Sequence, residues 1–313
     1  MRLSPFSKVL WLCVALFAAD TAALAQVIFW TDFGGRIQRA NVDGSFRRVV
    51  LQRWFTEPLG VCVDTHEGYV YWTDYAPPQI GRAKLDGTDV KILLTWEDGI
   101  QRPRGIAVDP VGRFLYWTDE FDYSLHRCRL DELVPELVAV GSFPNAIAID
   151  SLEAKVYWTD FWRGQILRAN GDGTEVESLV YQADSYPWGI ALDLVDRKLY
   201  WTTRGSRKIQ RADLDGTNIE ELPVSELIGP RAIVVDHEAG KLYWMDGESD
   251  ITVYSTNLNG SDRQVLNGPT GRIGWLAINA DRDELYWTNR NKYEFAVQRI
   301  VTVHGNPADR GYG

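Results

Sequence analysis

The amino-acid sequence predicts an all-β fold, a β-propeller with four-stranded blades, and three observations support this prediction. A tetrapeptide centred on Trp recurs along the chain, with consecutive tryptophans 41 to 45 positions apart. Asp-Gly or Asn-Gly pairs recur between short strand-like runs, and helical periodicity is absent after the first 25 residues. A period of this length accommodates the four short strands of one propeller blade.

The tetrapeptide marks one strand of each repeat. Its strict copies are Phe29–Asp32, Tyr71–Asp74, Tyr116–Asp119 and Tyr157–Asp160, and its looser copies are Tyr200–Thr203, Tyr243–Asp246 and Tyr286–Asn289. Their tryptophans are Trp30, Trp72, Trp117, Trp158, Trp201, Trp244 and Trp287. We expect these indoles to pack between neighbouring blades, where each buries a large apolar area. We expect the tetrapeptide Asp to be a buried hydrogen-bond acceptor at a strand end rather than a catalytic acid.

The rest of each repeat supplies the other strands. Before the tetrapeptide comes an apolar run such as Gly105–Asp109, which has the length and composition of a strand buried on both faces. A proline precedes most of these runs, at a strand start, where the missing N–H costs least. After the tetrapeptide come a strand-like segment such as Ile37–Asn41 and the pair Asp43-Gly44, which is a strong hairpin signal.

The first 25 residues have the pattern of a secretory leader. Arg2 and Lys8 lie ahead of an apolar run at 9–19, and Ala23-Leu24-Ala25 is a small-residue cleavage signal. The run is shorter than the roughly 20 residues of a membrane span, so a signal anchor is the less favoured alternative. The predicted divisions are a cleaved signal peptide at 1–25, a single propeller domain at 26–303 and a short flexible tail at 304–313.

Composition excludes several classes of protein. The net charge of −10 and a pI near 5.0, without a basic cluster, make nucleic acid and anionic membrane poor partners. Three Cys exclude a disulfide scaffold or a Cys-based zinc module, and four His leave little room for a His-rich metal site. Cys62 and Cys128 stand where other repeats have Ala, so we predict two free thiols, with a Cys62–Cys128 disulfide as the less favoured alternative.

These motifs closely resemble the low-density-lipoprotein-receptor class B repeat. The resemblance rests on the Tyr-Trp-Thr-Asp tetrapeptide, on a preceding segment such as Pro103–Asp109 and on a following segment such as Ile209–Gly216, and it covers roughly 27–300. It implies six blades, closed when a C-terminal inner strand such as Trp275–Asn279 completes the first blade. Seven tetrapeptides, counted literally, give seven blades of which the first and last each lack one strand. A ring of six blades is favoured, and a ring of seven blades remains the alternative.

Aromatic and arginine residues outside the tetrapeptide map to one face of a propeller, because the blade-to-blade connections and the loops after the second strands open there. The mapped residues are Trp54, Tyr75, Trp96, Arg104, Phe121, Tyr123, Phe161, Trp162, Arg163, Tyr186, Trp188, Arg231 and Trp275. Rigid aromatics and Arg are typical of binding hot spots. The predicted ligand-binding residues are Trp54, Tyr75, Arg104, Phe161, Trp162, Trp188 and Arg231. The alternative is that these aromatics plug the central channel or brace loops.

Three function classes compete. The resemblance implies a non-enzymatic extracellular module that binds a protein ligand, which we expect to be monomeric, without cofactor or metal, and secreted (periplasmic in a Gram-negative host). A second class is glycan or small-ligand binding at the channel mouth. The third, a calcium-dependent lactonase or esterase, is less favoured: of the residues after the inner-strand prolines only Asn145 offers an oxygen ligand, and no catalytic motif is present. Asn259 is either an N-glycosylation acceptor or simply part of a hairpin turn.

Overall fold

The computed structural model describes the backbone of residues 27–301 except for 33–35, 42–47, 53–57, 65, 85–87, 238, 249–250, 268–275, 280–283 and 291–294. It describes side chains from 59 to 266, with the same gaps and without residue 63. The predicted signal peptide at 1–25, the tail at 304–313, and Trp54 and Trp275 therefore lie outside the described residues. The side chains of Trp30 and Trp287 also lie outside them.

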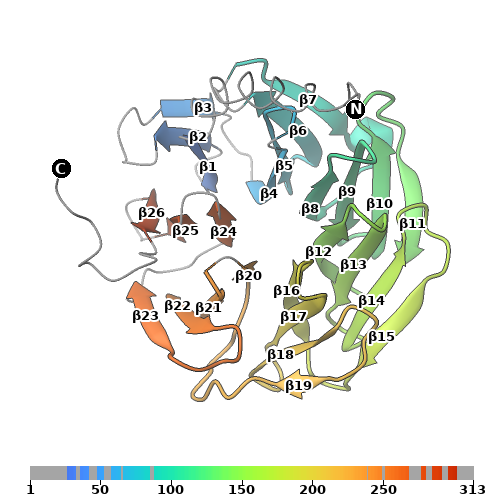
Figure 1. Cartoon of the computed structure of the whole chain (residues 1–313). Coiled ribbons are helices and arrows are strands. Elements are labelled where there is room, and N and C mark those ends of the chain that lie inside the picture. Colours follow the sequence, from blue (N-terminus) through green and yellow to red (C-terminus); the bar gives the residue numbers. More distant parts are fainter. Residues whose placement is uncertain are drawn as a thin grey trace, which may run out of the picture.

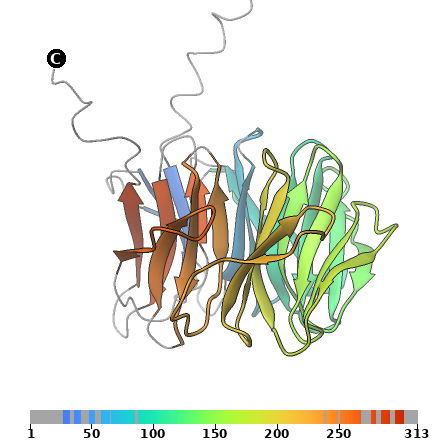
Figure 2. The same ribbon diagram turned by 60° about the horizontal axis from the view of Figure 1, so that its bottom comes forward.

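Antiparallel sheets stand side by side in a ring (Figures 1 and 2). Five have four strands, which run in chain order from the inner to the outer edge. The first two blades contain β4 (Pro58–Asp64), β5 (Tyr69–Asp74), β6 (Gln79–Lys84) and β7 (Lys91–Thr95), and then β8 (Pro103–Asp109), β9 (Phe114–Asp119), β10 (Ser124–Arg129) and β11 (Glu136–Val140). The next two contain β12 (Pro144–Asp150), β13 (Lys155–Asp160), β14 (Gln165–Asn170) and β15 (Glu177–Tyr181), and then β16 (Pro187–Asp193), β17 (Lys198–Thr203), β18 (Lys208–Asp213) and β19 (Glu220–Glu221). The fifth contains β20 (Ile233–Asp236), β21 (Lys241–Asp246), β22 (Thr252–Asn257) and β23 (Gln264–Asn267). The predicted all-β propeller with four-stranded blades is confirmed.

Two further sheets of three strands lie at the ends of the chain. They contain β1 (Val27–Asp32), β2 (Arg36–Asn41) and β3 (Arg48–Gln52), and β24 (Leu276–Asn279), β25 (Glu284–Arg290) and β26 (Phe295–Val301). A single 3₁₀ turn, η1 (Trp96–Asp98), is the one helical element of the described residues. No helix among the described residues is long and apolar enough to cross a membrane.

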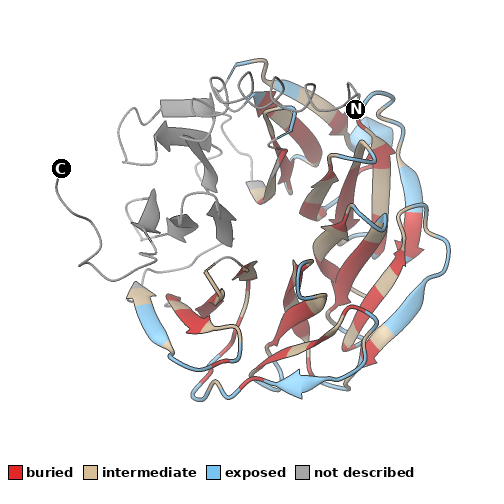
Figure 3. Ribbon diagram, in the orientation of Figure 1, coloured by how far each residue is buried: buried red, intermediate tan, exposed pale blue. Residues whose placement is uncertain are grey.

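The tetrapeptide strands are the most buried part of each four-stranded blade (Figure 3). In β5, β9, β13, β17 and β21 every residue after the first is buried, because each of these strands has a neighbour on both sides and a sheet against both faces. The inner strands are less buried than predicted: in β8, Ala107 and Val108 are only half-buried. The reason is that each inner strand is an edge of its sheet, with a strand neighbour on one side only.

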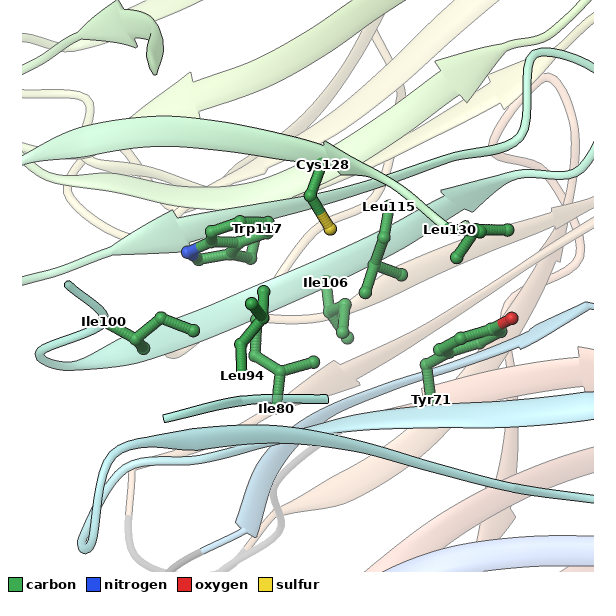
Figure 4. Close-up of a cluster of buried hydrophobic side chains, with 9 residues drawn as sticks. All are labelled: Tyr71, Ile80, Leu94, Ile100, Ile106, Leu115, Trp117, Cys128 and Leu130. Carbon is green, nitrogen blue, oxygen red and sulfur yellow. The ribbon is translucent and has the colours of Figure 1, made fainter. Parts of the chain in front are cut away.

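The core lies between blades, as predicted for the tetrapeptide tryptophans. Tyr71 of one blade and Trp117 of the next share a cluster with Ile106 and Cys128 (Figure 4). The same pairing of a tetrapeptide Tyr with the Trp of the following blade recurs at the next three boundaries, in the pairs Tyr116 with Trp158, Tyr157 with Trp201 and Tyr200 with Trp244. Cys62 and Cys128 are free thiols, as predicted.

Three of the predicted hairpins lie among the described residues, and they join β14 to β15, β18 to β19 and β22 to β23. Gly173, Gly216 and Gly260 have φ near +83°, a backbone conformation that glycine adopts without strain. At Asn259 the side-chain oxygen accepts hydrogen bonds from the backbone and hydroxyl of Ser261, so the turn explains this residue. Its glycosylation stays a prediction.

Candidate binding site at the loop face

The register of the strands defines one face of the ring, which we call the loop face. In the β8–β11 blade, Pro103 pairs with Asp119, which pairs with Ser124, which pairs with Val140. The start of the inner strand, the end of the second, the start of the third and the end of the fourth are therefore level. The blade-to-blade connections that the structure describes, from β7 to β8, β11 to β12, β15 to β16 and β19 to β20, consequently lie on this face.

The tetrapeptide Asp holds these connections in place. Asp119 accepts hydrogen bonds from the backbone N–H groups of Gln101 and Arg102, just ahead of β8. Asp160 does the same for Ser142 and Phe143 ahead of β12. The prediction that this Asp is a buried hydrogen-bond acceptor is confirmed, because both carboxylates accept from backbone N–H groups of the connection.

The tetrapeptide Thr then anchors the first residues of the next inner strand. Thr159 Oγ1 accepts from the N–H of Ala146 at 3.0 Å and donates to the carbonyl of Trp188 at 3.1 Å, in the neighbouring blade. The same two bonds recur at the other described strict tetrapeptides, with the carbonyls of Arg104 and Asn145 as acceptors. Successive blades thus present equivalent residues toward the ring axis.

Three guanidinium groups surround Trp188, and we call these four residues the Trp188 centre. The Cζ atoms of Arg104, Arg204 and Arg231 lie 5.8, 5.2 and 5.6 Å from the indole centroid. These are cation–π distances. The three arginines come from three different blades, so the centre exists only when the ring is assembled.

Two acidic residues partly neutralise the Trp188 centre. Glu120 pairs with Arg104 at 2.7 Å, and Glu248 pairs with Arg204 at 2.7 Å and lies 4.0 Å from Arg231. Arg231 also donates to the carbonyls of Gly247 and Glu248 at 3.2 Å. Among the described residues, the Nε atoms of Arg104 and Arg204 and the Oδ1 of Asn145 are buried without a hydrogen-bond partner. Such atoms are rare in native proteins and are often functional.

An aromatic shell flanks the Trp188 centre on one side. Phe161 meets Trp188 edge-on at 5.5 Å and Trp162 edge-on at 4.8 Å, and stacks on Tyr186 at 5.1 Å. Phe143 lies 5.7 Å from Phe161 and 5.2 Å from the guanidinium of Arg104. The predicted residues Arg104, Phe161, Trp162, Trp188 and Arg231 are therefore brought together.

Two predicted or mapped residues lie apart from this group. Tyr75 is in a second cluster, in which Arg102 lies 5.5 Å from the Tyr75 ring and 5.8 Å from that of Phe121. Trp96, in η1, is 65% exposed and makes no ring contact with the centre among the described residues. Tyr75 is thus separate from the Trp188 centre, and Trp54 falls outside the described residues.

Sequence reasoning missed Arg204 and Phe143. Arg204 directly follows the fifth tetrapeptide, at the repeat position that Tyr75 and Phe161 occupy, so aligning the repeats would have found it. Phe143 directly precedes the inner-strand proline Pro144, a position that the repeat pattern does not single out.

A Ser-His-Asp group is present but has the wrong geometry for a hydrolase. Both Ser124 Oγ and Asp122 Oδ2 address the same ring nitrogen of His126, Nε2, and Ser124 is 1% exposed. A catalytic relay needs one ring nitrogen for each partner and an accessible hydroxyl. Burial raises the pKa of Asp122, but hydrogen bonds from His126 and Ser124 outweigh it and hold the pKa below its usual value.

On the opposite face, His237 bridges to the preceding blade. Its Nδ1 lies 3.0 Å from the buried carboxylate of Asp193 and 3.9 Å from that of Asp196. Nearby, Arg197 makes a similar link to Asp150 at 2.9 Å. The sequence pattern did not reveal these links, because the residues come from turns in different blades.

Comparisons with known proteins agree with this architecture. Residues 68–110 and 197–237 match the low-density lipoprotein receptor repeat class B, so the chain carries this repeat. Nidogen-2 of Mus musculus is 38% identical over 70 residues, which are 22% of this chain and 5% of Nidogen-2. The chain thus corresponds to a small part of that relative.

Two solved structures share the fold. A chain from the nidogen/laminin complex superposes with a TM-score of 0.65 at 24% identity, over 77% of this chain and 93% of that one. Virginiamycin B lyase from Staphylococcus aureus superposes with a TM-score of 0.67 at 20% identity, over 83% of this chain and 87% of that one. At these identities the likeness concerns the fold, which binding proteins and enzymes share.

Proposed function

We propose that this class B repeat propeller is a secreted, non-enzymatic module that binds a protein ligand at the Trp188 centre. The observation that carries the proposal is the convergence of Arg104, Arg204 and Arg231 on one half-buried indole. Arg and Trp are the residues most enriched in binding hot spots. The guanidinium groups favour a ligand segment that presents a carboxylate or carbonyl oxygens.

Protein binding suits the centre better than a sugar does. A sugar ring would stack on an open aromatic face, but three guanidinium groups and Phe161 already crowd around the Trp188 indole. The fold relative from the nidogen/laminin complex supports the proposal, because that propeller was found with a protein partner. The leader-like pattern at 1–25 supports secretion.

The experiment is affinity capture from the extracellular fraction of the source organism with immobilised chain 26–313. A double variant, Trp188→Ala with Arg231→Ala, is compared with Leu152→Ala, which changes a residue that is 81% exposed in a turn of the opposite face. All three proteins are first required to have the same thermal unfolding. We expect a partner that is retained by the wild type and by the control variant and lost by the double variant. Equal capture by the double variant would place the site elsewhere, and calcium-dependent lactone or ester turnover would contradict a non-enzymatic role.

For the blade count, we propose seven, the alternative to the six that the resemblance favours. Six blades require β24 to pair with β1, whereas β24 pairs with β25, with Leu276 opposite Trp287. Among the described strands β1 pairs only with β2, and it lies next to β4 and β25. These pairings support a ring in which the first and last sheets are both short by one strand.

A further inference from the structure

A pocket of about 320 Å³ opens beside the β12–β15 blade; it shares Trp162 with the aromatic shell but contains none of the four residues of the Trp188 centre. Trp162 and Arg163 come from the β13–β14 turn, Gln165 from the start of β14 and Tyr181 from the end of β15. Ala183 and Asp184, in the connection to β16, complete the lining. The volume is at the lower end of the range of small-ligand sites.

Two exposed aromatic rings line this pocket. Trp162 is 58% and Tyr181 67% exposed, although both are large hydrophobic side chains. The Trp162 ring is held by edge contacts with Phe161 at 4.8 Å and Tyr186 at 5.8 Å. The Trp162 ring is therefore held in place, so its ordering costs little entropy when a ligand binds.

Opposite charges share the pocket without pairing. Within the part of the chain that the structure describes, neither the guanidinium of Arg163 nor the carboxylate of Asp184 has a hydrogen-bond or ion-pair partner. In the same blade, Arg168 pairs with Glu177. Arg163 and Asp184 thus keep hydrogen-bonding capacity for a ligand while their charges cancel.

The connection that carries Asp184 is held in a strained shape. Asp184 and Tyr186 have φ of 56° and 50°, in the left-handed region that side-chain-bearing residues seldom adopt. Two glycines make this possible, since a Cβ at Gly164 would lie 2.2 Å from the carbonyl oxygen of Gln182 and one at Gly205 would lie 2.0 Å from that of Asp184. The connection is clamped between turns of two blades, which places Asp184 and Tyr186 beside Trp162.

We infer that this pocket binds a neutral saccharide. The apolar C–H face of a sugar ring packs on an exposed aromatic ring, and its hydroxyl groups need both donors and acceptors, which Arg163, Gln165 and Asp184 supply. The balanced charge disfavours an anionic ligand such as a phosphate, and the three polar side chains disfavour a purely apolar one. The inference goes beyond the proposed protein binding, because it concerns another site.

The test is saturation-transfer NMR of the chain with a panel of neutral monosaccharides and disaccharides at millimolar concentration, followed by titration of each sugar that binds. The variants are Tyr181→Ala and Asp184→Asn. The matched control is Trp96→Ala, which removes an indole that is 65% exposed elsewhere on the chain. Thermal unfolding verifies that every variant is folded.

We expect at least one neutral sugar to bind, with affinity about tenfold or more weaker in Tyr181→Ala and Asp184→Asn. Binding should be unchanged in Trp96→Ala. No binding of any neutral sugar, or binding by both pocket variants that is as tight as that of the wild type, would overturn the inference. Protein capture that is lost on changing Trp188 and Arg231 would stand in each of these cases, so the two proposals fail separately.

Discussion

Thr159 links the core of one blade to the candidate site in the next. Its hydroxyl accepts from the backbone N–H of Ala146 and donates to the carbonyl of Trp188, and the side chain itself is fully buried. Thr159, the third residue of its tetrapeptide, therefore stabilises two contacts. It closes its own blade against the inner strand, and it fixes the backbone of Trp188.

Thr159→Val should destabilise the protein by about 1–3 kcal/mol. Valine has nearly the same shape, so the change leaves the N–H of Ala146 buried without a partner. It also removes one of the two hydrogen bonds to the carbonyl of Trp188, the other of which comes from the side-chain amide of Asn145. Guanidinium unfolding measures the loss. Thr217→Val is the control, because that Thr lies in an exposed turn where water replaces lost hydrogen bonds, and its cost should stay within about 0.5 kcal/mol. Equal costs in both variants would contradict the role given to Thr159.

The thiols of the native protein should be unreactive. Burial, with Glu136 nearby, raises the pKa of Cys128 to about 12, and burial, with Asp64 nearby, raises that of Cys62. Because the thiolate is the reactive form, a thiol reagent at mildly alkaline pH should label neither residue until denaturant is added. Rapid labelling of the folded chain would show that these boundaries between blades open readily.

At the scale of elements, the Asp-Gly hairpins should make stability depend on pH. Hydrogen bonds from the hydroxyl and N–H of Thr217 lower the pKa of Asp215, and those of Thr174 lower the pKa of Asp172. A carboxyl whose pKa is lower in the folded state stabilises it above the unfolded pKa of 3.8, and this contribution is lost as pH falls through the folded pKa. We therefore expect the free energy of unfolding to fall as the pH drops below about 4.

Denaturant unfolding at neutral and acidic pH checks this expectation. The double variant Asp172→Asn with Asp215→Asn should lose stability at neutral pH and show a shallower decline in acid, since asparagine does not titrate. An identical pH dependence in the wild type and the double variant would assign the acid sensitivity to other carboxyl groups.

At the scale of the whole molecule, ring closure decides which strands are indispensable. A seven-sheet ring uses β25, which lies against β1, together with β26, whereas a six-bladed ring makes both strands surplus. Ending the chain after residue 280 should therefore lower the Tm by roughly 10 °C or more, because two strands and the contact with β1 are lost. Differential scanning calorimetry measures the change. An unaltered Tm would favour six blades closed by β24.

Repeat reasoning worked where the signal is local and recurs. Strand positions, hairpins, the tetrapeptide core and the role of Asp160 as a buried hydrogen-bond acceptor all follow from patterns within one repeat. It was less accurate for the inner strands, where the apolar run around Ala107 suggested burial on both faces. A run of apolar residues reports hydrophobicity and not whether the strand has a neighbour on its inner edge.

By itself, the sequence determined the all-β propeller, the blade period and the loop-face location of most candidate residues. The tertiary structure decided which of these residues meet. Arg104, Trp188, Arg204 and Arg231 form one centre while Tyr75 and Trp96 lie apart, and Arg163 and Asp184 share a pocket without pairing. The physical reason is that strands and turns are set by neighbours within a repeat, whereas contacts between loops depend on how the blades are oriented around a common axis.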